Sequence, residues 1–266
     1  MRTIVCVKQV PASNEVRLDP KTNTIIRDGA QAVINPFDSH ALEAALQMKE
    51  CFGGTVTALS MGIPDTERML CECVARGADR ALLLTDRAFA GADTLATSYA
   101  LYCGVKAAGE FDLILCGKMA VDGDTAQIGP ELAERLGVPH VTDVEWLEAE
   151  ADGKAVTVRR QLGSSVQTLR VPLPAVLTVT REVNVPRLPS IAGVLHAEET
   201  EVALFDVRRA AADEALCGLK GSPTQVVRTY LPQSTRTVEE IGGTLLQQRM
   251  RLVEIIKGEV NYGAGH

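Results

Sequence analysis

Short apolar runs alternate with longer amphipathic segments through the first half of the chain. The runs have the length and the Val, Ile and Leu content of buried strands, and they lie at residues 3–8, 55–61, 81–84 and 112–116. Between them, apolar residues recur every three or four positions, which is typical of helices. The first predicted helix begins at Asn35–Asp38, with Asp38 or Ser39 as its cap. Three further helices are predicted at residues 66–75, 93–108 and 125–136. This alternation predicts βαβ units and a mainly parallel sheet flanked by helices.

The pattern changes after residue 139. Residues 142–149, 155–162 and 165–171 alternate in polarity and predict antiparallel hairpin strands, followed by an apolar strand at 175–180. Prolines then interrupt an extended arm that begins near Asn184 and ends in a predicted helix at 238–257. The apolar stripe of that helix fits packing on its own domain or on a partner. We therefore expect an α/β domain at residues 1–185 and a C-terminal arm at 186–266.

The loop at residues 117–130 is the most informative segment. It follows the apolar run 112–116, so it lies at the carboxyl end of a strand, where open α/β sheets bind ligands. Gly123 allows a ligand to approach the backbone closely. Asp122 and Asp124 either cap the next helix or bind ribose hydroxyls. Thr125 and Gln127 add neutral hydrogen-bonding groups that suit phosphate or base edges. A capped turn without a ligand would have similar residues.

Composition and charge narrow the class of protein. The 266 residues suffice for one large α/β domain with an appendage, and 46% hydrophobic but only 4% aromatic residues suit a sandwiched parallel sheet. The net charge of −7 argues against nucleic acid as a partner. No apolar run is long enough for membrane insertion and no leader precedes the first strand, so we expect a cytoplasmic protein with reduced cysteines. The four histidines and seven cysteines lack metal-ligand spacing, and no metal site is predicted.

Several catalytic and phosphate-binding motifs are absent. The chain has no G-x-G-x-x-G after its first strand, no G-x-x-x-x-G-K-[ST], no G-x-S-x-G and no H-E-x-x-H. No catalytic acid, base or nucleophile is therefore predicted. The chain is interpreted as a nucleotide-binding protein without side-chain catalysis. An adenine-nucleotide-dependent enzyme and a small nucleotide sensor remain as alternatives.

Separated motifs along nearly the whole chain resemble the β subunit of electron transfer flavoproteins. These motifs are Val7-Lys8-Gln9-Val10, Asn35-Pro36-Phe37-Asp38, Gly77-Ala78-Asp79-Arg80, the loop at 117–130, Leu173-Pro174-Ala175-Val176 and Asn184-Val185-Pro186-Arg187. The resemblance implies a Rossmann-like fold of the adenine-nucleotide-binding type and a heterodimer with an α subunit. It also implies electron traffic through flavin.

Members of the family that this chain resembles differ in the nucleotide that this subunit binds. Many members hold AMP in this subunit, whereas electron-bifurcating members hold a second FAD. AMP-type members carry a third acid where this chain has Gly123, so the loop resembles the FAD type. FAD would then accept hydride from NADH and pass electrons to ferredoxin or flavodoxin and to an acyl-CoA dehydrogenase. The cofactor-binding residues implied are Lys8, Val10, Asn35, Ala120, Asp122, Gly123, Asp124, Thr125 and Gln127.

Residues 186–197 resemble the family's recognition loop, which anchors the dehydrogenase through an aliphatic residue. That residue is Ile191 in this chain. Many members are rich in lysine after this loop, whereas residues 196–201 here are acidic. This departure puts the identity of the redox partner in question.

Overall fold

The computed structural model describes residues 1–12, 17–18, 25–26, 32–227 and 240–262 of the chain. The chain divides into two compact units, Met1–Val226 and Val227–His266. The boundary that the sequence placed after residue 185 does not coincide with this division. Residues beyond 185 join the first unit because β13 pairs with β7 and α5 packs against α2.

The strands and helices alternate in the first unit. The strands are β1 Arg2–Cys6, β2 Gln9–Pro11, β3 Arg17–Leu18, β4 Ile25–Ile26, β5 Ala32–Ile34, β6 Thr55–Met61, β7 Arg80–Leu84, β8 Leu113–Gly117, β9 His140–Ala149, β10 Ala155–Leu162, β11 Ser165–Pro172, β12 Ala175–Val179 and β13 Ala203–Phe205. The helices are α1 Pro36–Phe52, α2 Thr66–Arg76, α3 Thr94–Ala108, α4 Ile128–Leu136, α5 Ile191–Glu199 and α6 Leu245–Tyr262, with short 3₁₀ helices η1 Arg87–Phe89, η2 Arg181–Val183 and η3 Glu214–Leu216.

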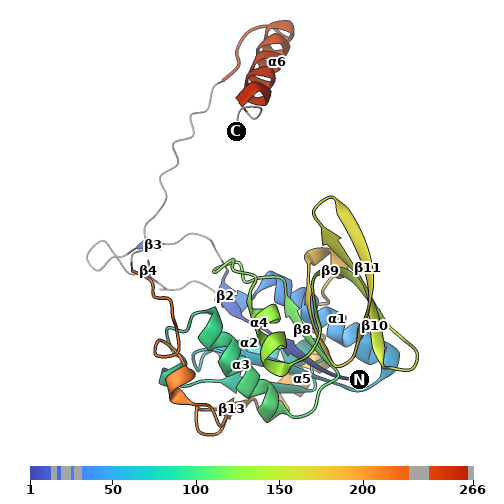
Figure 1. Cartoon of the computed structure of the whole chain (residues 1–266), viewed down its shortest axis with the longest axis vertical. Helices are drawn as coiled ribbons and strands as arrows, with labels where there is room; N and C mark the ends of the chain where they lie inside the picture. The colour runs from blue at the N-terminus through green and yellow to red at the C-terminus, as the bar shows by residue number, and fades with distance from the viewer. Residues whose placement is uncertain (13–16, 19–24, 27–31, 228–239, 263–266) are drawn as a thin grey trace. The chain divides into compact units, whose positions relative to one another are not determined.

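One nine-stranded sheet forms the centre of the first unit, in the order β11-β10-β9-β12-β8-β1-β6-β7-β13 (Figure 1). Its strands pair in parallel from β9 to β13, while β10 pairs antiparallel with both β9 and β11. The predicted fold class, a mainly parallel sheet with helices and an antiparallel hairpin, is confirmed.

Helices cover both faces of the parallel part of the sheet. One hydrophobic core lies under α1, α2 and α5, and includes Leu42, Leu70 and Ala197. The other lies under α3 and α4, and includes Leu101 and Leu132. Strands enclosed on both faces must be apolar along their length, which explains why β8 and β12 read as continuous apolar runs.

The order of the strands defines a switch point between β1 and β8. From β1 the chain adds β6 and β7 on one side, and then returns to add β8 and β12 on the other. Loops on the two sides therefore diverge above the carboxyl ends of β1 and β8. In open α/β sheets this divergence forms the ligand-binding crevice.

The cap of one helix and the starts of two others differ from the sequence prediction. Helix α1 has Asn35 as its N-cap and proline at its first position, so neither Asp38 nor Ser39 caps it. Helix α4 begins at Ile128, because Asp124 and Ala126 adopt left-handed backbone conformations that interrupt a helix. Helix α6 spans Leu245–Tyr262; the predicted start at 238 lies outside the described residues, but residues 240–244 are described and are not helical, so the predicted helix begins too early.

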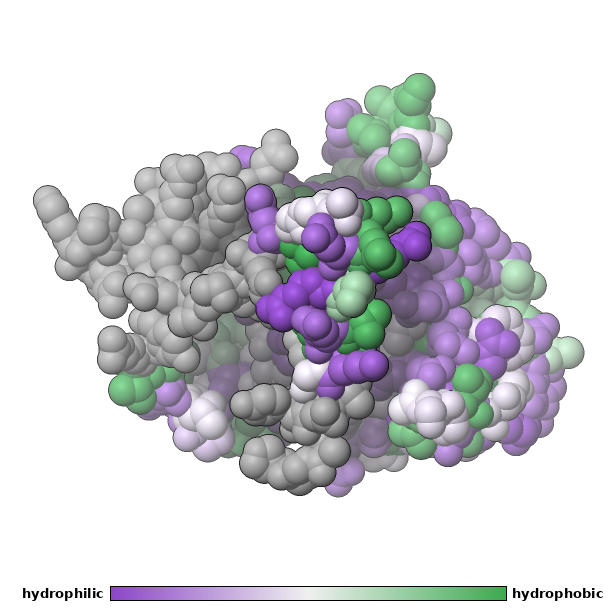
Figure 2. Space-filling model, turned by 90° about the horizontal axis from the view of Figure 1, so that it is seen from above, coloured by the Kyte–Doolittle hydropathy of each residue, from purple (hydrophilic) through white to green (hydrophobic). Residues whose placement is uncertain are grey.

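Hydrophobic and hydrophilic residues are interspersed over the described part of the face shown in Figure 2. Among the described residues, no helix combines the length and the apolar character needed to cross a bilayer.

Candidate functional site

Asn35 connects the start of α1 to the loop that follows β8. Its side chain is completely buried. Its Nδ2 donates to the carbonyl oxygen of Met119 at 2.9 Å, and its Oδ1 accepts from the backbone N–H of Val121 at 3.1 Å. Its own backbone N–H donates to the carbonyl oxygen of Lys8 at 2.8 Å. One buried amide thus fixes both walls of the crevice, since a buried amide must satisfy its donors and acceptors.

Asp38 bridges the ends of β1 and β8. Its buried carboxylate accepts from the N–H of Lys8 at 2.8 Å and from the N–H of Gly117 at 3.1 Å. Burial raises the pKa of Asp38 to about 7, against the opposing effect of its hydrogen bonds with Asn35 and these two amides. A Cβ on Gly117 would lie 2.3 Å from Asp38 Oδ1 and 2.6 Å from Phe37 Cβ, so only glycine fits there.

The loop after β8 turns sharply and is exposed from residue 121 to 127. Ala120 accepts from the N–H groups of Gly123 at 3.2 Å and of Asp124 at 2.8 Å, which closes a tight turn. Asp124 and Ala126 have φ values of 53° and 55°. Non-glycine residues in this region are sparse and concentrate at binding sites.

Lys8 and Asp122 form an ion pair across the crevice, with Nζ 2.7 Å from Oδ1. The side chains are 49% and 35% exposed. Such an exposed pair contributes only about 0–1 kcal/mol to stability. Both groups are therefore available to rearrange around a ligand at little cost.

Gly123 has no steric need to be glycine within the described chain. No heavy atom lies within 4 Å of the position that a Cβ would occupy, and its φ is not in the left-handed range. The turn itself therefore does not explain the glycine. The open space above it is consistent with close approach of another molecule.

Two adjoining hollows lie along the carboxyl ends of β8 and β12 and beside the middle of β9. We name the first, of about 490 Å³, the loop hollow. It is lined by Phe37, Lys118, Met119, Val121, Asp124, Thr180, Arg181 and Glu182. The Arg181 guanidinium lies 4.7 Å from the centre of the Phe37 ring, a cation–π contact that connects η2 to α1.

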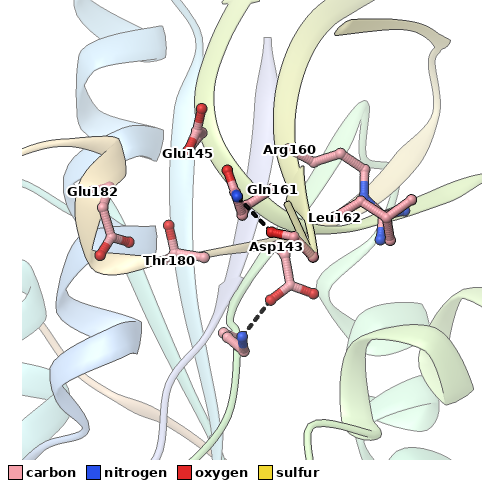
Figure 3. Close-up of a pocket in the computed structure, with 9 residues that line it drawn as sticks. Asp143, Glu145, Arg160, Gln161, Leu162, Thr180 and Glu182 are labelled. Carbon is pink, nitrogen blue, oxygen red and sulfur yellow. Dashed lines mark hydrogen bonds and ion pairs between the residues drawn. The ribbon is translucent and has the colours of Figure 1, made fainter. Parts of the chain in front are cut away.

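We name the second, of about 560 Å³, the hairpin hollow. It is lined by Lys118, Asp143, Glu145, Arg160, Gln161, Leu162, Gly163, Thr180 and Glu182. Figure 3 shows Thr180 and Glu182 on one side and the hairpin residues Arg160 and Leu162 on the other. Lys118 Nζ lies 2.5 Å from Asp143 Oδ1. A hydrogen bond with Thr180 lowers the pKa of Glu182.

The structure brings together most of the predicted site residues. The Lys8 and Asp122 side chains pair with each other, the Asn35 side chain bonds the backbone of the same loop at Met119 and Val121, and Ala120, Gly123 and Asp124 form the turn there. Asp122 was an alternative helix cap, but it pairs with Lys8 instead, and Gln127 occupies the N-cap position of α4 without a side-chain cap bond.

Three residues that the sequence predicted for the site or for partner docking are not part of the contacts described above. Thr125 is exposed on the loop. The side chain of Val10 is only 1% exposed, because β2 pairs with β5 and buries it. Ile191 lies at the start of α5 and is 84% exposed.

Asp38 and the residues that follow β12 were not predicted from the sequence as site residues. Asp38 was assigned only to capping. Thr180, Arg181 and Glu182 stand directly after an apolar strand, so the rule that located the 117–130 loop would also have found them. Within the part of the chain that the structure describes, no cluster of three or more His, Cys, Asp or Glu side chains is arranged to hold a metal ion.

Comparison with known proteins agrees with this geometry. Residues 22–210 match the model of the electron transfer flavoprotein domain. The chain is 46% identical over 249 residues to the caffeyl-CoA reductase-Etf complex subunit CarD of Acetobacterium woodii, covering 93% of this chain and 94% of that protein.

Two further relatives extend the comparison. Identity to the electron transfer flavoprotein subunit beta of Clostridium acetobutylicum is 45% over 242 residues, or 91% of each chain. Identity to protein FixA of Azorhizobium caulinodans is 43% over 240 residues, covering 88% of this chain and 85% of that one. The chain belongs to the electron transfer flavoprotein family, and within it to the β subunits.

Proposed function

We propose that the crevice between β1 and β8 holds FAD, with its adenosine and diphosphate parts at the 117–130 loop. The observation that carries this proposal is the open glycine at position 123, beside the Lys8–Asp122 pair. An acid at this point would repel a diphosphate, whereas glycine leaves space for it and adds no charge.

The residues present fit such a ligand. Left-handed backbone at Asp124 and Ala126 is typical of turns whose N–H groups converge on an anion. Lys8 supplies a cation, and Asp122 and Asp124 supply acceptors for ribose hydroxyls. The buried amide of Asn35 holds this loop in place from below.

The flavin would supply the redox chemistry, and the protein would supply binding and orientation. We propose that NADH reduces this FAD by hydride transfer and that its electrons separate toward ferredoxin or flavodoxin and toward an acyl-CoA dehydrogenase. The relative in Acetobacterium woodii is named as part of a caffeyl-CoA reductase complex. That name supports a CoA-ester oxidoreductase as one partner here.

The dehydrogenase would dock at the segment around Ile191. Arg187 anchors this segment to α1 through Glu43 at 2.8 Å and Glu50 at 2.5 Å. Aliphatic side chains nevertheless remain exposed along it, namely Val185, Leu188, Ile191, Val194 and Leu195. A rigidly held segment with exposed apolar residues suits an interaction site.

The α subunit would contact α6 in the second unit. Six large hydrophobic side chains of this helix are between 47% and 69% exposed, namely Leu245, Leu246, Met250, Leu252, Val253 and Ile256. A helix with such a face needs a partner surface.

The test is the ligand content of the complex coexpressed with its α subunit. Heat-released ligands separated by chromatography should give two FAD per heterodimer. One FAD with one AMP would instead identify a conventional electron transfer flavoprotein with AMP in this subunit. A complex without any nucleotide in this subunit would overturn the assignment of the crevice.

A further inference from the structure

One side of helix α5 is fixed against the rest of the first unit. The helix packs on α2, and a Cβ on Gly193 would overlap the carbonyl oxygen of Ala75, so the two helices approach closely there. Ala197, one turn further along α5, is buried on the same side. Ser190 caps the helix, because its Oγ accepts from the N–H of Gly193 at 2.9 Å. The orientation of α5 is therefore set by its own chain.

The opposite side of α5 carries three large aliphatic residues. Ile191, Val194 and Leu195 are 84%, 44% and 58% exposed, and they lie within one turn of the helix. We name these three residues the aliphatic face. Single exposed apolar residues are ordinary on a protein surface, whereas a group of neighbours indicates an interaction site.

The aliphatic face is bordered by acids at the end of the helix. Glu198, Glu199 and Glu201 are exposed, and we name them the acidic rim. The sequence from residue 188 to 205 contains no lysine or arginine. Among the described residues, none of the three glutamates forms an ion pair, and Arg187, just before this stretch, pairs with α1 instead.

The acidic rim is placed where it disfavours the helix. Glu198 and Glu199 lie in the last turn of α5, at the negative end of the helix dipole, and the first turn holds no acid. The stabilising arrangement would be the reverse, with acids at the start and cations at the end. These acids thus do not stabilise the helix that carries them, and a function in recognition accounts for them.

Resting on the proposed docking of a dehydrogenase at this segment, we propose that the partner is basic where it meets α5. Its surface offers an apolar pocket for the aliphatic face, and lysine or arginine side chains beside that pocket pair with the acidic rim. An apolar centre with charged groups at its edge is the ordinary anatomy of a transient protein interface.

The two parts of this surface have different effects on binding. The aliphatic face supplies affinity, because buried apolar anchors carry most of the binding free energy. The acidic rim supplies attraction at a distance and selects the partner, because it repels a dehydrogenase whose pocket is edged with acids. The acidic rim is therefore a determinant of which dehydrogenase the heterodimer serves.

The experiment is steady-state turnover of a purified acyl-CoA dehydrogenase by the heterodimer, with the dehydrogenase concentration varied. In the double variant Glu198→Gln, Glu199→Gln, the KM for the dehydrogenase should rise about three- to tenfold at about 20 mM salt, with kcat unchanged. At about 0.5 M salt, where charges are screened beyond about 4 Å, variant and parent should agree within about twofold. The midpoint of thermal unfolding should stay at the parental value or rise, because acids have been removed from the negative end of the helix.

The matched control is Glu134→Gln, Glu148→Gln, which removes two exposed acids on α4 and β9 and changes the net charge equally. Its KM should stay within about twofold of the parent at both salt concentrations. An unchanged or lower KM in the variant at low salt, or an equal rise in the control, would overturn the proposal. Concentration-dependent self-association of the parent that the variant abolishes would also overturn it and would assign this face to a second copy.

Failure of the proposed function is visible separately. If a flavin-loaded parent heterodimer turns over no acyl-CoA dehydrogenase at any salt concentration, the proposed function is refuted before any variant is made, and this inference falls with it. If the parent turns over the dehydrogenase and only the charge dependence is missing, the proposed function stands and the basic character of the partner is refuted.

Discussion

At the scale of single residues, Gly123 is the most direct test of the nucleotide site. The structure places no atom within 4 Å of its Cβ position, so Gly123→Asp should fold normally. A carboxylate near a diphosphate should weaken FAD binding by about 1–4 kcal/mol at about 4 Å and an effective dielectric constant of about 20–80. FAD occupancy of the purified heterodimer, measured by absorbance against protein, checks this expectation.

Thr125→Ser is the matched control for Gly123→Asp. It lies on the same exposed loop and retains the hydroxyl group. It should keep nearly parental FAD occupancy. Equal occupancy in both variants would mean that the phosphates lie away from this loop.

The raised pKa of Asp38 leads us to expect that the stability of the chain depends on pH. Its pKa is about 7 in the folded chain against 3.8 for an ordinary aspartate, because burial disfavours the charged form. The folded state therefore binds more protons than the unfolded state between these values, so the free energy of unfolding falls as pH rises from about 4 to about 7. Asp38→Asn should remove this part of the pH dependence.

Thermal unfolding of the complex at about pH 5 and about pH 8 measures the effect of Asp38. The midpoint of the parent should fall relative to that of Asp38→Asn as the pH rises. Asp65→Asn serves as control, since Asp65 is 54% exposed in its side chain. If the midpoints of thermal unfolding of the parent and of Asp38→Asn differed by the same amount at both pH values, the expectation would be wrong.

At the scale of elements, the sequence predicted the strands whose residue pattern follows from local burial. It did not predict features that depend on contacts with distant elements. Continuous apolar runs identified β8 and β12, because enclosure on both faces requires them. The start of α4 was misplaced by three residues, because the left-handed backbone at Asp124 and Ala126 has no signal of its own in the sequence. The role of Asp38 depends on amides from two distant strands, which no local pattern contains.

Helix α5 offers a test of the docking segment. Ile191 is 84% exposed, so Ile191→Ala should change the free energy of unfolding by no more than about 0.5 kcal/mol. Loss of a central interface anchor commonly costs about 2 kcal/mol or more of binding. Electron transfer to the dehydrogenase should therefore slow, while flavin reduction by NADH stays at the parental rate. Stopped-flow reduction and partner turnover on one preparation measure both rates.

Val166→Ala is the control for Ile191→Ala, because Val166 is an exposed aliphatic residue on the hairpin strand β11. It should leave both rates unchanged. Parental turnover in Ile191→Ala would place the anchor elsewhere, and the acidic residues 196–201 would become the better docking candidate.

At the scale of the whole molecule, the sequence predicted the class of fold but not the order of its strands. The alternating pattern implied a parallel sheet, yet it did not show that β1 lies between β6 and β8. That order creates the crevice and brings Lys8 to Asp122, 114 residues away in the chain. The bulges of β9 lie in its pairing with β10 and with β12, which no local pattern contains, so the hairpin hollow was invisible in the sequence.

The second unit yields the last prediction, which concerns assembly. Met250 and Val253 are 60% and 47% exposed on α6, so replacing both with glutamine, a good helix former, should not unfold the helix. If this apolar face binds the α subunit, the double variant should lose most of the one-to-one complex while the first unit keeps its fold. Size-exclusion chromatography of the coexpressed subunits measures the complex.

The control for this variant is Glu254→Gln, which changes an exposed polar residue of the same helix that pairs with Arg251 at 3.4 Å. A surface pair of this kind contributes little, so the complex should survive its loss. Full recovery of the heterodimer with the double variant would show that the α subunit does not need Met250 and Val253. In that case the assignment of this part of α6 to the α subunit is wrong, and the docked dehydrogenase becomes the next partner to examine.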